Sequence, residues 1–224
     1  IEVHPWVTLA SRYSSLFPEF APSGTPANAF NVHDVGFHQL MANIVGELVG
    51  KYAVDGVNFD FVRTAGFCTA TQCTTEYQQK YGRNLVTDIS TYNSGSYIQQ
   101  AAKVPTLMEY QESAVTQMIK TVADRIRSIK PSILISAAVG MGIEGNNAVG
   151  AITFQWFNGQ NGLDWANKGI VDALLRMDYG TNPQIWLNDN LRLDLDSPNQ
   201  ITWLIGNGSQ TGSWIASTVT SFIQ

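Results

Sequence analysis

The sequence contains few charged residues. Lys, Arg, Asp and Glu make up 14% of its 224 residues, well below the roughly 25% that is usual in soluble domains. The net charge is -5 and no run of Lys or Arg occurs, so a surface that follows nucleic-acid phosphates is not expected. No apolar stretch reaches the roughly 18 residues of a membrane span. These absences predict a polar, uncharged partner, with no nucleic-acid binding and no membrane insertion.

Histidine and cysteine are also scarce, with three and two copies. Because His33 and His38 flank a predicted helix start and His4 stands apart from them, we expect no metal centre, and no cofactor is implied. Cys68 and Cys73 lie in FCTATQC, a poor spacing for metal ligands. A local disulfide is favoured over two reduced thiols, and it would indicate an extracellular, cell-surface or particle-associated location.

Several well-known signatures are missing. Neither GxGxxG nor GxxxxGK[ST] follows a predicted strand, and no GxSxG nucleophile elbow occurs. The first residue is Ile1 and no signal peptide follows it, so a processed or partial product is expected. The length is enough for one sizeable core, which predicts one domain over residues 1–224.

Short apolar runs alternate with helical patterns along the chain. Strands are predicted at 1–9, 54–62, 133–139, 170–179 and 201–206, and helices at 33–52, 107–130 and 212–223, with a helical or irregular segment at 154–169. Residues 64–107 are predicted to be a long polar loop insertion with one short helical piece near 74–82. This alternation predicts a parallel sheet.

The helix predicted at 33–52 has Val35, Leu40, Ile44, Leu48 and Tyr52 at helical spacing, which predicts its apolar face. Asp34 stands near its start as a candidate cap.

The strand VDGVNFDFV has the most informative pattern. Side chains alternate in a strand, so Asn58 and Asp60 share one face and Phe59 lies on the other. Polar and aromatic residues gather where the predicted strands end, which favours a closed (β/α) barrel over an open doubly wound sheet. Arg63 could pair with the Asp60 carboxylate. The alternative is an Asp–Arg pair that only shapes a loop.

Five stretches resemble the glycosyl-hydrolase-like family ten, also called domain of unknown function 187. They are IEVHPWV, ELVGKYAVDGVNFDFVR, EYQQKYG, IRSIKPSILISAAV and DWANKGIVDALLRMDY, in order from Ile1 to Tyr179. The resemblance implies a (β/α)8 TIM-type barrel that acts on carbohydrate, with Asp60 in the catalytic position. It also implies that this chain covers about strands three to seven, and that other segments or chains complete the barrel.

Hydrolysis of a glycosidic bond commonly uses two carboxyl groups. Asp60 is the first candidate, and Asp178 or Glu144 the second, with Asp178 slightly favoured because it ends a predicted strand. Candidate substrate-binding residues are His4, Trp6, Asn58, Arg63 and Tyr179.

The leading hypothesis is therefore a hydrolase that cleaves O-glycosidic bonds in a polysaccharide or oligosaccharide by carboxylate chemistry. A non-catalytic, carbohydrate-binding or structural barrel in a larger extracellular or particle assembly is the main alternative, because a fold does not by itself establish catalysis. A hydrolase of another bond in a polysaccharide, such as an amide, is the third.

Overall fold

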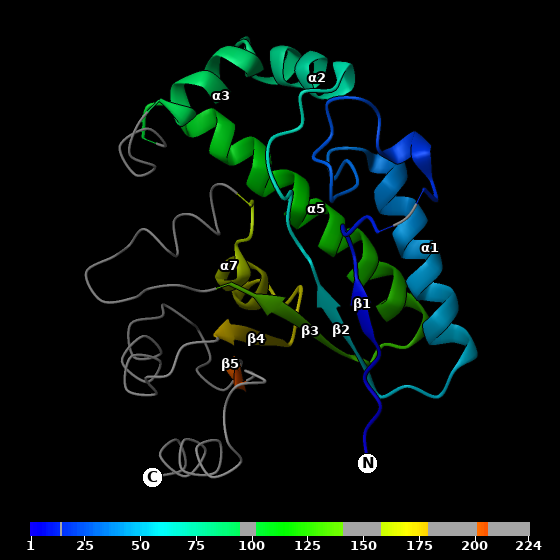
Figure 1. The fold of residues 1–224 in the computed structure, drawn as a ribbon. Coiled ribbons are helices and arrows are strands. Elements are labelled where there is room, and N and C mark those ends of the chain that lie inside the picture. Colours follow the sequence, from blue (N-terminus) through cyan, green and yellow to red (C-terminus); the bar gives the residue numbers. More distant parts are fainter. Residues whose placement is uncertain (14, 95–101, 141–157, 179–200, 206–224) are drawn as a thin grey trace, which may run out of the picture.

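A five-stranded parallel sheet forms the centre of the molecule (Figure 1). The computed structural model describes residues 1–13, 15–94, 102–140, 158–178 and 201–205, with only the main chain described at 176, 178 and 201–205. The strands are β1 (Trp6–Thr8), β2 (Gly56–Asp60), β3 (Leu134–Val139), β4 (Ala173–Asp178) and β5 (Ile201–Ile205). They pair in chain order, so the predicted parallel sheet is confirmed.

Helices connect the strands. They are α1 (Val35–Lys51), α2 (Thr71–Tyr81), α3 (Leu85–Asn93), α5 (Pro105–Ile129) and α7 (Gly162–Asn167), with a short 3-10 turn at Pro18–Phe20. The helix predicted at 212–223 lies outside the described residues. None of the helices in the described part of the chain is both long and apolar enough to cross a membrane.

The main core lies between the sheet and the helices α1 and α5 (Figure 1). Val57 and Phe59 of β2 are fully buried there, together with Val45 of α1 and Met118 of α5. Since neighbouring residues of a strand point to opposite faces, Asn58 and Asp60 lie on the face turned away from these helices. The predicted division of β2 into two faces is therefore confirmed.

The predicted apolar face of α1 is wrong. Helix α1 buries a row of residues four apart, Phe37, Met41, Val45 and Val49, whereas Tyr52 is 66% exposed. The sequence offers two adjacent apolar rows at helical spacing, and packing against the sheet selects the row that holds the aromatic ring of Phe37. The cap is as predicted, because the Asp34 carboxylate accepts a hydrogen bond from the Gly36 N–H at 2.8 Å.

The loop predicted at 64–107 is wrong where α3 forms, while the short helical piece predicted within it, near 74–82, is confirmed by α2. The two helices build a second small core with the start of α5 that includes Tyr77, Leu85, Tyr92 and Leu107. Tyrosine rings supply much of its apolar surface, and the Tyr77 hydroxyl donates to buried Asp88 at 2.7 Å. Polar residues on the outer sides of both helices hide this pattern in the sequence.

Candidate functional site

Asp60 occupies the carboxyl end of β2 and is half-buried. Its main-chain carbonyl accepts a hydrogen bond from the Leu9 N–H at 2.8 Å, just past the end of β1. In the register of the two strands Asp60 pairs with Thr8. The carboxylate is thus presented at the end of the sheet where barrel enzymes place their reacting groups.

The turn that follows Asp60, residues 61–66, contains two non-glycine residues in the left-handed region. Phe61 has φ 51° and Ala65 has φ 55°. A residue with a bulky side chain in this conformation costs roughly 1–3 kcal/mol, and such strain gathers at functional sites. Surrounding contacts must therefore hold this turn in place.

Arg63 does not form the expected ion pair. Its guanidinium lies over the Phe61 ring, 4.2 Å from the centroid, and among the described residues no ion pair joins it to Asp60. The left-handed turn brings the Phe61 ring under the cation, and cation–π attraction replaces the pairing that sequence spacing suggested.

Asn58 lies two residues before Asp60, on the same face of β2. It is 8% exposed and donates through Nδ2 to the Ser136 hydroxyl of β3 at 2.9 Å. This bond links the two neighbouring strands directly beneath the carboxylate.

The structure separates the two aromatic candidates at the amino terminus. His4 precedes β1 and packs on Gly56, where an added Cβ would come within 2.3 Å of its Nδ1. Because Gly56 begins β2 and Asp60 ends it, His4 lies at the opposite end of the sheet from the carboxylate, and its predicted place at the site is wrong. Trp6 pairs with Asn58 in the strand register and is 68% exposed.

The remaining candidates are described only in part. Asp178 is the last residue of β4, which stands two strands from β2, and only its main chain is described. Tyr179 and Glu144 lie outside the described residues, so their predicted roles stay predictions. Among the residues that the structure describes, no group of three or more His, Cys, Asp or Glu side chains is arranged to hold a metal ion.

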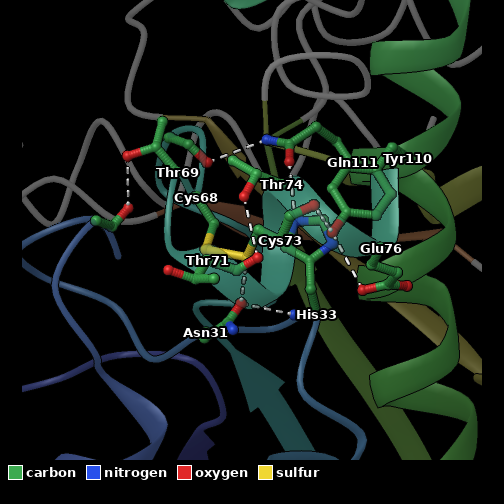
Figure 2. Close-up of a disulfide and its surroundings, with 12 residues drawn as sticks. Asn31, His33, Cys68, Thr69, Thr71, Cys73, Thr74, Glu76, Tyr110 and Gln111 are labelled. Carbon is green, nitrogen blue, oxygen red and sulfur yellow. Dashed lines mark hydrogen bonds between the residues drawn. A yellow bond between two sulfur atoms is a disulfide. The ribbon is translucent and has the colours of Figure 1, made fainter. Parts of the chain in front are cut away.

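A buried polar cluster beside the turn was not predicted from the sequence, and Figure 2 labels its members His33 and Gln111. Gln111 of α5 donates to the Thr64 hydroxyl at 2.9 Å and to the Gly66 carbonyl at 3.0 Å. Its own oxygen lies 3.1 Å from His33 Nε2, which identifies that nitrogen as the donor. The cluster thus joins the segments that follow β1 and β2 to α5.

His33 is neutral in this cluster. Burial lowers its pKa from 6.5 to about 3, against a smaller opposing effect of the hydrogen bond with Gln111, while His38 and Lys80 lower it slightly further. A neutral imidazole with Nε2 protonated is the form that donates to Gln111.

The predicted disulfide is confirmed, since Cys68 and Cys73 are bonded. It closes the segment between the turn after β2 and the first residues of α2, beside His33 (Figure 2). The side-chain oxygen of Asn31 lies 3.4 Å from the Cys73 sulfur, a packing contact because a bonded sulfur has no hydrogen to donate.

Two hollows lie away from Asp60. One of about 630 Å³ runs between α5 and α7, lined in part by Glu112, Thr116 and Asp164. Another of about 390 Å³ lies between His33 and α2. Neither is lined by Asp60, so we locate the candidate site by the strand ends and not by these hollows.

Solved structures identify the class of fold. The chain is similar to a beta-galactosidase from Rahnella sp. R3, with a TM-score of 0.53 and 12% identity over 80% of this chain and 29% of that one. It is also similar to a beta-galactosidase from Halorubrum lacusprofundi, with a TM-score of 0.50 and 15% identity over 89% of this chain and 33% of that one. The fold is that of the TIM-barrel glycosidases, as predicted, and the chain spans about a third of the length of these two proteins.

The sequence identifies the family. The model of the family described as Glycosyl hydrolase-like 10 matches residues 29–186, and the chain belongs to this family. No curated protein matches the sequence. The resemblance inferred from the motifs is therefore confirmed, while the number of each strand within an eight-stranded barrel stays a prediction.

Proposed function

We propose that the protein hydrolyses O-glycosidic bonds in a polysaccharide and that Asp60 is one of its two reacting carboxyl groups. The observation that carries this proposal is the half-buried Asp60 at the carboxyl end of β2, immediately before the left-handed Phe61. Main-chain strain of this kind is costly and gathers at functional sites. Membership of a glycosyl hydrolase-like family supports a carbohydrate as the substrate.

Asp178 is the proposed second carboxyl group. It ends β4, and β4 is separated from β2 by β3 alone. Neighbouring strands lie roughly 4.8 Å apart and rise roughly 3.3 Å per residue. The register aligns Phe59 with Ala137 and Ala137 with Leu174, so Asp178 stands three residues farther along its strand than Asp60, about 10 Å beyond it and about 10 Å to the side. The proposal therefore requires the Asp178 side chain to lean back toward Asp60, to reach the separation of roughly 5 to 9.5 Å used by glycosidases. Glu144 is the alternative for the same role.

Substrate contacts are proposed for Trp6, Asn58, Arg63 and Tyr179. Trp6 pairs with Asn58 in the sheet register, so its exposed side chain belongs to the face of the sheet that carries Asp60. A flat aromatic ring suits the C–H groups of a sugar, and an amide suits its hydroxyl groups.

A complete barrel of this class has eight strands. We therefore propose that segments or chains outside residues 1–224 supply further strands beside β1 and β5. An extracellular, cell-surface or particle-associated location is proposed as well, supported by the Cys68–Cys73 disulfide and the low charge.

The test compares the intact protein with its Asp60→Asn and Asp55→Asn variants in a reducing-sugar assay over a panel of bacterial and plant polysaccharides. Asp55 is a matched control because it precedes β2 and accepts a hydrogen bond from the Val3 N–H at 2.8 Å, which an amide oxygen can also accept. We expect Asp60→Asn to lower the rate by about 100- to 10,000-fold, and Asp55→Asn to leave it nearly unchanged.

Equal losses in the two variants would argue against a reacting role for Asp60. No release from any substrate by the parent protein, with sugar binding retained, would replace the hydrolase proposal by the non-catalytic barrel.

A further inference from the structure

Two buried glutamines from different parts of the chain bind the segment that follows Asp60. Gln111 of α5 is 1% exposed and donates to Thr64 and Gly66. Gln160, just before α7, is 5% exposed and donates through Nε2 to the Val62 carbonyl at 3.3 Å.

Both amides also use their oxygens. The Gln160 oxygen accepts from the Gly140 N–H at 2.7 Å, directly after β3. The Gln111 oxygen accepts from His33, whose ring is stacked on Tyr110. A buried amide is costly unless its donors and its acceptor are matched. Each glutamine donates to a carbonyl of the segment, at Val62 or Gly66, and accepts from an N–H group, of Gly140 or His33. A carboxylate could not donate and an apolar side chain could do neither, so an amide fits both positions.

The two residues that follow β1 bind Asp60 and the first residue of the same segment. The Asp60 carbonyl accepts from Leu9, and the Phe61 carbonyl accepts from the Ala10 N–H at 3.3 Å. The Thr64 N–H donates to the Asn158 carbonyl at 3.0 Å. Hydrogen bonds therefore reach this segment from the ends of β1 and β3, from α5, and from the residues before α7.

We propose that Gln111 and Gln160 are positioning residues that fix the direction of the Asp60 carboxylate by holding residues 61–66 in the left-handed turn. This inference rests on the proposed function of Asp60. A carboxylate rotamer depends on the φ and ψ of its own main chain, and Asp60 is adjacent to the turn that the two amides hold. A misplacement of about 1 Å at a reacting group can cost on the order of 100-fold in rate.

The experiment uses Gln111→Met and Gln160→Met in the intact protein, because Met is similar in length and cannot form these hydrogen bonds. Gln117→Met is the control, since Gln117 lies on the same helix with an exposed side chain. Amide hydrogen exchange of the peptide that spans 61–66 measures directly how strongly the two glutamines restrain this segment. Steady-state kinetics on the polysaccharide found in the Asp60 assay measure its consequence.

We expect exchange in residues 61–66 to be at least about tenfold faster in both variants. We expect kcat to fall by about 10- to 100-fold with KM little changed, and the control to match the parent in both measurements. The split between kcat and KM separates positioning from a general loss of stability. If Gln111→Met does not fold, Gln160→Met still tests the inference.

Unchanged exchange in a folded variant would overturn the inference even where the parent hydrolyses polysaccharide. Faster exchange with unchanged kcat would overturn it too, because restraint of residues 61–66 would then have no effect on catalysis by Asp60. A parent without activity would overturn the proposed function and the catalytic role of the two amides together, and the exchange measurement would show separately whether they hold the turn.

Discussion

The ring of His33 stacks on the ring of Tyr110, with centroids 3.9 Å apart and planes inclined by 17° (Figure 2). This contact joins the segment after β1 to α5, across more than 70 residues of sequence. Burial favours the neutral imidazole, because a charged ring would lose its hydration there.

His33 is therefore expected to make stability depend on pH. Its pKa is 6.5 in an unfolded chain and about 3 in the folded protein, so below pH 6.5 the unfolded state binds a proton that the folded state does not. The free energy of unfolding should fall as pH drops from 6.5 toward 3, by up to about 1.4 kcal/mol per pH unit for this group. Denaturant unfolding at several pH values measures the slope.

The His33→Phe variant should have a smaller slope over this range, although it is less stable at neutral pH because the hydrogen bond with Gln111 is lost. Buried His38, whose pKa is also lowered by burial, keeps part of the slope. His4→Phe is the control, since His4 is exposed. Identical slopes for the parent and His33→Phe would contradict the neutral, buried state of His33.

The parts of the fold that were predictable from the sequence depend on short-range patterns. Alternation along β2 places Asn58 and Asp60 together because the period of a strand is two. The disulfide follows from two cysteines five residues apart, and α5 ends at Ile129, just before Pro131. Each of these inferences needs only residues that are close in the sequence.

The parts that were missed depend on contacts between distant segments. Gln111 sits among the apolar residues of α5 and carries no sign of its bond to Thr64, 47 residues earlier. An amide at a buried position of a predicted helix is a usable signal in principle, because such a group must find partners. The choice of α1 face and the position of His4 likewise depend on how the sheet is assembled.

Removal of the Cys68–Cys73 bond should lower stability moderately. The bond closes a short loop, with a sequence separation of 5, and chain-entropy arguments give about 2 kcal/mol for a loop of this size. The double variant Cys68→Ser, Cys73→Ser should lose about this amount in denaturant unfolding. The parent with a reducing agent should behave like the variant, and the variant should not respond to the reagent. A reagent effect on the variant would show that the loss arises elsewhere.

Alanine substitutions at Gly159 and Gly82 distinguish two contributions to the free energy of unfolding, the strain of a left-handed main chain and a steric clash of the added Cβ. Both have left-handed φ, 67° and 65°. A Cβ at Gly159 would come within 2.4 Å of the Gln111 carbonyl oxygen, whereas a Cβ at Gly82 would meet nothing within 4 Å. We expect Gly82→Ala to cost about 1 kcal/mol of unfolding free energy, and Gly159→Ala about 3 kcal/mol or more, because the main chain of α5 cannot move aside cheaply.

Since Gly159 contacts the residue that holds the turn after Asp60, Gly159→Ala should also speed hydrogen exchange in residues 61–66, and Gly82→Ala should not. Equal effects of the two substitutions on stability and exchange would show that the close approach of Gly159 to α5 does not support the turn.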